Sequence, residues 1–357
     1  MSLTVLFCGP IALEGVPPVG GYEACNVRTI TALRAKGVSI AEQYYPQPRG
    51  GAGAKLRGYL GGFLGLLRSM SRTRGDVFHL TGLYKHFALP ELLLLRRARA
   101  LGLKTVYDVR AGSMYRHYAR LGPVYRWLFR ALLRSADVVM IEGQDYDRFV
   151  RDVTGKPAFY LPNHLPTDRL PVRRAAQPGE PLRLLYVGRI TLDKGVETAL
   201  QTAQALRAAG IACEIAVAGG GDPALLQRLR DTYPFAIWLG SLTSDAVLAE
   251  LGRSHIFLFA TRHTGEGHSN ALTEAMAMGC VPVASDNGFN KSVIGPAGRV
   301  LPLAAEAPDY AGAIQQLWQG GEWPALSAAA ADRARGLFST DQAVDRLIGA
   351  YNSLMES

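Results

Sequence analysis

The sequence predicts an α/β protein of two domains, each a Rossmann-like, doubly wound parallel sheet. Three observations predict this fold. The 357 residues exceed what one hydrophobic core usually organises. Short runs rich in Val, Ile, Leu and Phe alternate with helix-length amphipathic segments, which is the pattern of parallel strands covered by crossover helices. The alternation occurs twice, and a proline-rich stretch over residues 162–181 separates the two series.

The first series predicts an N-terminal domain over residues 1–165. Its predicted strands are 4–8, 76–80, 104–108 and 137–141, and its predicted helices lie near 22–36, 54–72, 88–101 and 121–135. The five prolines at 162–181 cannot sustain a helix and indicate an interdomain linker. The second series predicts a C-terminal domain over residues 166–339, with strands at 182–187, 213–218, 236–239, 256–260 and 281–285.

The four cysteines form no C-x-x-C pair, so neither a disulfide scaffold nor a zinc ribbon is expected. The apolar run at the start lacks a basic flank and is too short for a secretory signal or a membrane span. These features favour a cytoplasmic protein. A peripheral position on the inner face of the cell membrane also fits, because of the charge distribution described next.

The net charge of +9 is concentrated in the N-terminal half. Residues 1–170 hold 24 basic and 12 acidic side chains, whereas the remainder holds 15 and 18. This asymmetry suggests an anionic partner, and because no nucleic-acid-binding motif is present, nucleic acid is not expected. Residues 55–74 and 125–134 mix apolar and basic side chains. Each segment either lies on an anionic membrane surface or packs its apolar stripe on its own sheet with its arginines solvated.

The loop after the strand 182–187 carries two cations. It reads Gly188-Arg189-Ile-Thr-Leu-Asp-Lys194-Gly195. Arginine supplies planar, paired donors and lysine a compact charge, so the pair suits a pyrophosphate leaving group. The alternative is that both side chains are simply solvated.

A second loop, after the strand 256–260, carries two carboxylates eight positions apart, Glu266 and Glu274. Ser269 or Asn270 is expected to cap a helix that begins near Ala271, which leaves Glu274 close to its first turn. The amides of a helix N-terminus bind anions or hydroxyls, and neighbouring glycines let a ligand approach the backbone. Alternatively, Glu274 only complements the helix dipole and Glu266 is a surface acid.

These elements resemble the retaining glycosyltransferases of family 4, which have the GT-B fold. The resemblance implies that the two Rossmann-like, doubly wound domains face a cleft. The resemblance is carried by the E-x7-E element at Glu266 and Glu274, the loop 188–195 and the run Glu-Ala-Met-Ala-x-Gly-x-x-Pro-Val over 274–283. Gly20 and Gly21 resemble the family's N-terminal glycine loop near the donor phosphate. Residues 162–163 resemble its hinge, and 218–222 its second glycine turn. The segment 340–357 resembles the helix that crosses back onto the N-terminal domain.

The resemblance implies transfer of a sugar from a UDP- or GDP-sugar to a lipid-linked or saccharide acceptor, with the anomeric configuration kept and no metal or other cofactor. The acceptor is expected on the N-terminal domain. Catalytic roles are implied for Glu266, Arg189, Lys194 and Arg110. Donor contacts are implied for Gly20, Gly21, Gly188, Arg189, Lys194, Gly219, Gly240, Ser241, Gly267, His268, Ser269, Asn270, Ala271 and Glu274.

Two positions depart from the family pattern. Arg110, beside Asp108, stands where many members have a histidine, and these two residues are expected on the acceptor side. His268 stands where many members have another residue and is expected either to shape the sugar pocket or to be a rim histidine with water partners. The D-x-D at Asp145 and Asp147 is interpreted as charges at a helix start rather than as a metal site.

Other functions on the same fold are a sugar-nucleotide epimerase or a glycosyl phosphorylase, and from another class a non-catalytic scaffold on a membrane surface. An epimerase would need no acceptor, a phosphorylase would need inorganic phosphate, and a scaffold would release no nucleotide. Because the N-terminal half is basic and apolar, we favour an acceptor that is lipid-linked or a growing bacterial surface polysaccharide.

Overall fold

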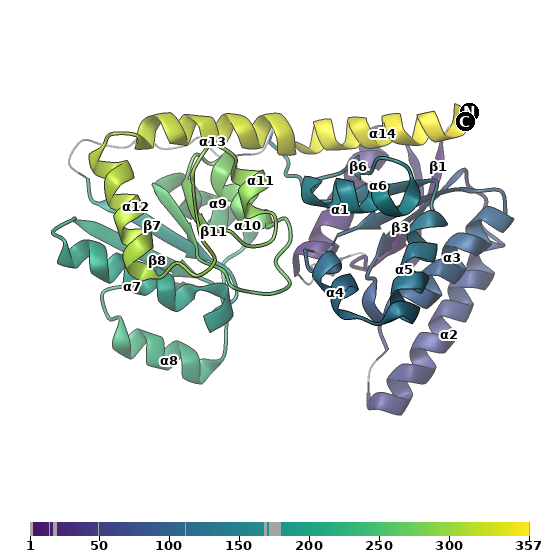
Figure 1. Cartoon of the computed structure of the whole chain (residues 1–357), viewed down its shortest axis with the longest axis horizontal. Helices are drawn as coiled ribbons and strands as arrows, with labels where there is room; N and C mark the ends of the chain where they lie inside the picture. The colour runs from purple at the N-terminus through teal and green to yellow at the C-terminus, as the bar shows by residue number, and fades with distance from the viewer. Residues whose placement is uncertain are drawn as a thin grey trace. The chain divides into compact units, whose positions relative to one another are not determined.

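The computed structural model describes residues 3–13, 15–16, 20–48, 50–110, 112–167, 170 and 180–356. It divides into two compact units, Met1–Pro162 with Thr340–Ser357, and Asn163–Ser339. The division falls three residues before the predicted boundary at 165. Each unit is built on a six-stranded parallel sheet flanked by helices, so the predicted fold class is confirmed (Figure 1). Most of the proposed linker, at 168–169 and 171–179, lies outside the described residues.

The sheet of the first unit has the strand order β2-β1-β3-β4-β5-β6. Its strands are β1 (Thr4–Gly9), β2 (Ser39–Tyr44), β3 (Val77–Gly82), β4 (Lys104–Val109), β5 (Val138–Ile141) and β6 (Phe159–Tyr160). Strands β2 and β6 were not predicted. Both are edge strands, which pair with a neighbour on one side only. Most residues of β2 are half-buried or exposed, so the strand has no apolar run that would reveal it in the sequence.

Helices cover both faces of this sheet. One face carries α1 (Gly20–Ala35) and α14 (Thr340–Glu356), whose Leu347 and Tyr351 are fully buried with Val5 and Val77 of the sheet. The crossovers through α2 (Ala52–Met70), α3 (Ala88–Ala100) and α5 (Pro123–Arg134) place these three helices side by side on the other face (Figure 1). The remaining helices of the unit are η1 (Lys85–Phe87), α4 (Met114–Arg120), η2 (Gln144–Tyr146) and α6 (Asp147–Thr154).

For helices α2 and α5 the structure shows the packing that one of the two interpretations of their composition predicted. Each buries an apolar stripe against its own unit, through Phe63 and Met70 in α2 and through Phe129 and Leu133 in α5. Each also exposes large apolar side chains. Within the described residues, no helix is both long enough and apolar enough to cross a membrane.

A buried carboxylate fixes the loop between β3 and α3. Glu91 of α3 is fully buried and accepts hydrogen bonds from the Tyr107 hydroxyl at 2.6 Å and from the Leu83 N–H at 2.6 Å. Burial raises the pKa of the Glu91 carboxyl to about 7, although these donors favour its ionised form. The loop needs such support because Tyr84 and Lys85 have positive φ angles of 44° and 46°, which non-glycine residues rarely adopt.

The sheet of the second unit has the order β12-β11-β10-β7-β8-β9. Its strands are β7 (Leu182–Val187), β8 (Cys213–Ala218), β9 (Ile237–Gly240), β10 (Ile256–Phe259), β11 (Val281–Ser285) and β12 (Arg299–Leu301). The helices are η3 (Leu192–Lys194), α7 (Val196–Ala208), α8 (Pro223–Thr232), α9 (Ser244–Arg253), α10 (Asn270–Ala277), α11 (Asn290–Ile294), α12 (Ala307–Gln319) and α13 (Trp323–Phe338). The short edge strand β12 was not predicted.

Candidate functional site

The candidate site lies where the strand order of the second unit reverses. From β7 the chain adds β8 and β9 on one side, and it then returns to place β10 on the other side of β7. In open α/β sheets, ligands bind at such a switch point, outside the carboxyl ends of the strands. The loops that follow β7 and β10 carry Lys194 and Glu266, so the topology brings the predicted cations and carboxylates to one edge.

The side chains of Lys194 and Glu266 form an ion pair at this edge. The ammonium Nζ lies 2.8 Å from Oε2 of the carboxylate, and the same oxygen accepts a 2.7 Å hydrogen bond from the Thr261 hydroxyl. Only 17% of the lysine side chain and 8% of the glutamate side chain are exposed. Glu266 is therefore not the surface acid that the sequence left as an alternative. It is a buried carboxylate whose negative charge is balanced by Lys194.

Glycines pack the loops after β7, β8 and β9 against one another. The N–H of Gly219 donates to the Gly240 carbonyl at 2.7 Å, and a Cβ on Gly219 would lie only 1.8 Å from the Gly188 carbonyl oxygen. A Cβ on Gly220 would meet the Ser241 hydroxyl at 3.0 Å. The predicted donor-site positions 188, 219, 240 and 241 are thus neighbours. Arg189 is exposed beside them, with its carbonyl bound by the Tyr186 hydroxyl at 2.7 Å.

We predict that Gly219→Ala destabilises the second unit by about 3 kcal/mol or more, since the added methyl group collides with a carbonyl and φ is +143°. Gly312→Ala is the matched control, because Gly312 lies in α12 with open space around it and alanine favours a helix. Urea denaturation measures both variants. Equal stability of the two would contradict the close approach of the loops.

The loop that carries Glu266 is held by the next strand. Asn287, after β11, donates to the carbonyls of Thr261 at 3.1 Å and His263 at 2.9 Å. His263 in turn contacts Asp193 of the β7 loop through Nδ1, at 2.6 Å. Hydrogen bonds from Thr191 and then from His263 lower the pKa of the Asp193 carboxyl. The loops after β7, β10 and β11 therefore form one connected rim around the ion pair.

Helix α10 begins where the sequence indicates. Ser269 is its N-cap and its hydroxyl accepts from the Leu272 N–H at 3.4 Å, while Asn270 and Ala271 are the first two helical residues. Glu274 is the fifth residue of α10, one position further into the helix than expected, because the helix begins at Asn270 rather than near Ala271. The residue is half-buried. Gly267, before the cap, is half-buried.

His268 is buried, so the structure does not support a rim histidine with water partners. Only 4% of the residue is exposed, its Nε2 lies 2.8 Å from the Thr273 hydroxyl, and its ring meets the Phe338 ring edge-on at 4.8 Å. Its carbonyl accepts a 2.6 Å hydrogen bond from the Asn163 side chain. His268 therefore anchors the start of α10 to α13 and to the beginning of the second unit.

Asp108 and Arg110 form a buried pair at the end of β4 in the first unit. Arg110 Nε donates to Asp108 Oδ2 at 2.7 Å, and its Nη1 lies 2.6 Å from the Cys25 sulfur. Burial alone would raise the pKa of the Asp108 carboxyl, but the Arg110 guanidinium and His79 hold it below its usual value. His79 lies 3.4 Å from Asp108 and 2.6 Å from the Tyr351 hydroxyl.

Sequence reasoning did not find His79 or Tyr351, because the two residues are 272 positions apart and the contact depends on how α14 docks. Gly20 and Gly21 are the first two residues of α1, whereas the sequence placed them in a glycine loop ahead of the helix. Asp147 is the first residue of α6, where it pairs with Arg151 at 3.0 Å and accepts from the Ala158 N–H at 2.9 Å. These are the contacts of a residue at a helix start.

Comparison with known proteins places the chain in context. Residues 181–320 match the family Glycosyl transferases group 1. The chain is 27% identical over 331 residues to an alpha-D-kanosaminyltransferase of Streptomyces kanamyceticus, with 82% of each chain covered. It is 28% identical over 188 residues to a putative colanic acid biosynthesis glycosyltransferase of Salmonella typhimurium, covering 50% of this chain and 44% of the relative.

Solved structures share the fold over the whole chain. A sucrose-phosphate synthase from Thermosynechococcus elongatus superposes with a TM-score of 0.75 at 17% identity, covering 99% of both chains. The Anabaena protein HepE, solved in complex with UDP-glucose, superposes with a TM-score of 0.69 at 12% identity, covering 98% of this chain and all of the other. At these identities the likeness concerns the fold alone.

Proposed function

This chain is a glycosyltransferase with the GT-B fold, and we propose that it is a retaining enzyme of family 4 that transfers a sugar from a nucleoside diphosphate sugar to a lipid-linked or polysaccharide acceptor. The observation that carries the proposal is the buried pair of Lys194 and Glu266 at the switch point of the second sheet. A cation at this edge suits a phosphate leaving group, and the carboxylate beside it suits a sugar that becomes positively charged.

In the proposed donor complex, Arg189 and Lys194 bind the diphosphate and Glu274 binds the ribose. Glu266 and the backbone of residues 267–270 bind the donor sugar. The glycine contacts at 188, 219 and 240 support this arrangement, because residues without side chains let a nucleotide approach the backbone. The complex of the similar Anabaena structure with UDP-glucose supports a nucleotide sugar as the donor.

The proposed reaction proceeds on one face of the sugar. The bond from the anomeric carbon to the diphosphate oxygen breaks as the bond to the acceptor oxygen forms, and the acceptor proton passes to the leaving phosphate oxygen. Lys194 and Arg189 stabilise the charge on the departing diphosphate, so no metal is needed. Glu266 stabilises the oxocarbenium-like sugar electrostatically. The competing double displacement would make Glu266 the nucleophile.

The acceptor side of the proposal rests on α2. Its Leu56, Leu60 and Leu64 are spaced by four residues and are 62%, 58% and 52% exposed, so they form one apolar stripe on the helix. A groove of about 390 Å³ runs between this stripe and α3, and its lining is almost entirely apolar. Arg57 and Arg68 are exposed on the same helix. An apolar groove beside arginines suits a hydrocarbon chain that carries a phosphate.

A panel of UDP-, GDP- and ADP-sugars in a thermal-shift assay, followed by NMR of the product anomer, tests the proposed reaction. We expect one nucleotide sugar to stabilise the protein and the product to keep the donor's anomeric configuration. Inversion would refute the retaining assignment. Turnover of the donor without an acceptor, or only with inorganic phosphate, would favour an epimerase or a phosphorylase instead.

We predict that replacing four exposed arginines of α2 and the segment after it, Arg57, Arg68, Arg72 and Arg74, with glutamate abolishes binding to vesicles that contain anionic lipid. The matched control reverses the same number of exposed charges in the second unit, at Arg228, Arg230, Arg253 and Arg335. Co-sedimentation measures both. Unchanged partitioning of the first variant would refute the membrane contact.

The double variant Asp145→Asn, Asp147→Asn is expected to keep near-wild-type turnover, with EDTA present or absent. The Asp147→Asn change retains a side-chain oxygen that accepts from the Ala158 N–H, so only a small loss of stability from the Arg151 pair is expected. Loss of turnover in a variant that still melts like the wild type would show that the D-x-D has a catalytic role.

A further inference from the structure

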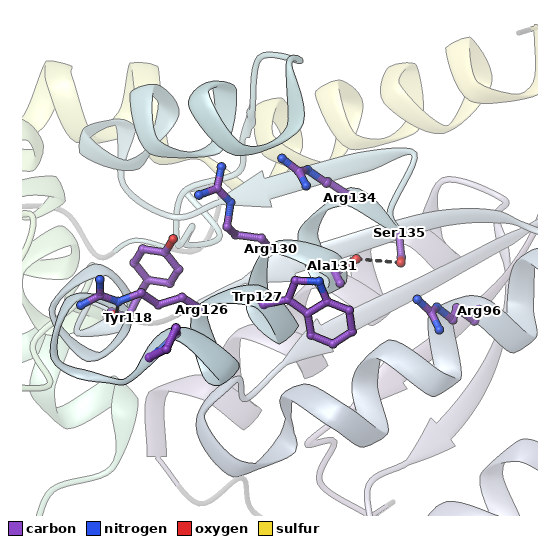
Figure 2. A pocket seen from close by; sticks show the side chains of 9 residues that line it. Arg96, Tyr118, Arg126, Trp127, Arg130, Ala131, Arg134 and Ser135 are labelled. Atoms are coloured by element: carbon purple, nitrogen blue, oxygen red, sulfur yellow. Dashed lines mark hydrogen bonds between the residues drawn. The ribbon is translucent and has the colours of Figure 1, made fainter.

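A hollow in the first unit, between α3 and α5, is lined by four arginines (Figure 2). Arg126, Arg130 and Arg134 are spaced by four residues and therefore lie along one face of α5, and Arg96 reaches the hollow from α3. The hollow measures about 690 Å³, and none of the described residues that line it is acidic. We call it the α5 arginine pocket.

The positive charge of this pocket is not balanced from within. Arg126 donates to the carbonyl of Ala119 at 2.6 Å and Arg134 to that of Val153 at 2.8 Å, so both are held by groups without net charge. In the part of the chain that the structure describes, the side chains of Arg96 and Arg130 have neither an ion pair nor a hydrogen bond. Like charges spaced by four residues destabilise a helix, so the row of arginines does not serve the stability of α5.

Apolar side chains project beside the arginines. Trp127 is 67% exposed and lies between Arg96 and Arg130 in the view of Figure 2. Val124, three residues before Trp127 on α5, is 79% exposed. Tryptophan prefers the headgroup region of a membrane, because the apolar part of its indole ring contacts the lipid tails while the indole N–H stays hydrated. A helix with arginines on one face and exposed apolar residues beside them has the composition of an interfacial helix.

We propose that the α5 arginine pocket binds the phosphate headgroup of an anionic membrane lipid while Trp127 and Val124 enter the headgroup layer. Guanidinium groups bind phosphate with paired hydrogen bonds, so four of them around one hollow suit a phosphate ligand better than they suit an ordinary solvated surface. The leucine stripe of α2 is exposed on the same side of the sheet, where α3 lies between α2 and α5 (Figure 1). The inference adds a headgroup site to the proposed membrane contact, and it does not depend on sugar transfer.

The test compares two double variants with the same net charge. Arg96→Gln with Arg130→Gln removes the two arginines whose side chains have no ion pair or hydrogen bond among the described residues. Arg148→Gln with Arg346→Gln removes two exposed arginines on α6 and α14. Both are sedimented with phosphatidylcholine vesicles containing phosphatidylglycerol. We expect the pocket variant to lose binding by about tenfold or more and the control by less than about threefold. Equal losses would refute a specific pocket.

Tryptophan fluorescence identifies the source of the phosphate. We expect a blue shift on addition of the anionic vesicles, and its loss in Trp127→Phe, while millimolar inorganic phosphate produces no shift and does not displace the vesicles. Displacement by inorganic phosphate, or by a short oligonucleotide, would refute the lipid assignment. Vesicle binding is measured without a sugar donor. Failure of the proposed transfer reaction would therefore not affect the headgroup site, and failure of vesicle binding would not affect the proposed transfer reaction.

Discussion

Replacing Lys194 with methionine is expected to lower kcat/KM by about 100-fold to 1,000-fold, which is the typical cost of removing one preorganised charge or donor from a leaving group. Methionine keeps most of the volume of the side chain but carries no charge. The free energy of unfolding is also expected to fall, because the Glu266 carboxylate, 8% exposed, then keeps only the Thr261 hydroxyl as its partner among the described residues.

The matched control for Lys194→Met is Arg228→Met. Arg228 pairs with Glu197 at 3.1 Å in the same unit, but its side chain is 49% exposed, so solvent screens the pair. We expect near-wild-type kinetics and stability from this control. Steady-state kinetics with the donor found by thermal shift, together with urea denaturation, measures both variants. If Lys194→Met lost stability but kept kcat/KM, the lysine would serve only to neutralise Glu266.

The fold was predictable because its signals are local. Each central strand of both sheets is a run of apolar residues, so the predicted strands at 4–8, 104–108 and 182–187 fall on β1, β4 and β7. The edge strands β2, β6 and β12 escaped prediction because an edge strand needs fewer apolar residues, and β6 and β12 are very short. These strands form because each pairs with a neighbouring strand of its sheet, and that pairing cannot be seen in the local sequence.

The candidate site was predictable as a set of residues but not as a set of contacts. The spacing within each loop identified Lys194 and Glu266 separately, and it assigned the lysine to phosphate and the glutamate to the sugar. Their ion pair depends on β10 lying next to β7, which is a property of strand order. The same holds for His268, since its burial depends on Phe338, 70 residues later in a helix of its own.

Polar groups inside the first unit were the hardest to foresee. Glu91 lies within a leucine-rich helix, and a lone carboxylate in an apolar run was its only signal. Its partners Tyr45 and Tyr107 come from different segments of the chain. In contrast, the mixture of apolar and basic side chains over residues 125–134 was visible in the sequence, but only the structure shows that Arg96 of α3 joins the arginines of α5.

Replacing Glu266 with glutamine is expected to lower kcat by at least about 100-fold while the fold is kept. The amide oxygen of glutamine still accepts the hydrogen bond from Thr261, whereas the negative charge that faces Lys194 is lost. Without that charge the developing positive charge on the sugar loses its stabilisation in the transition state. Because the interaction matters most in the transition state, kcat is expected to fall more than the affinity for the donor.

The variant Glu266→Ala with added azide distinguishes the two mechanisms for this carboxylate. If Glu266 is a nucleophile, azide can take the space that the side chain leaves and attack the anomeric carbon, and the azido sugar would have the inverted configuration. For a carboxylate that acts only by its charge, azide produces no inverted product, and the residual product keeps the donor's anomeric configuration. We expect the second result. An inverted glycosyl azide in the NMR spectrum would establish the double displacement, because only a vacated nucleophile position opens that face of the sugar to an external anion.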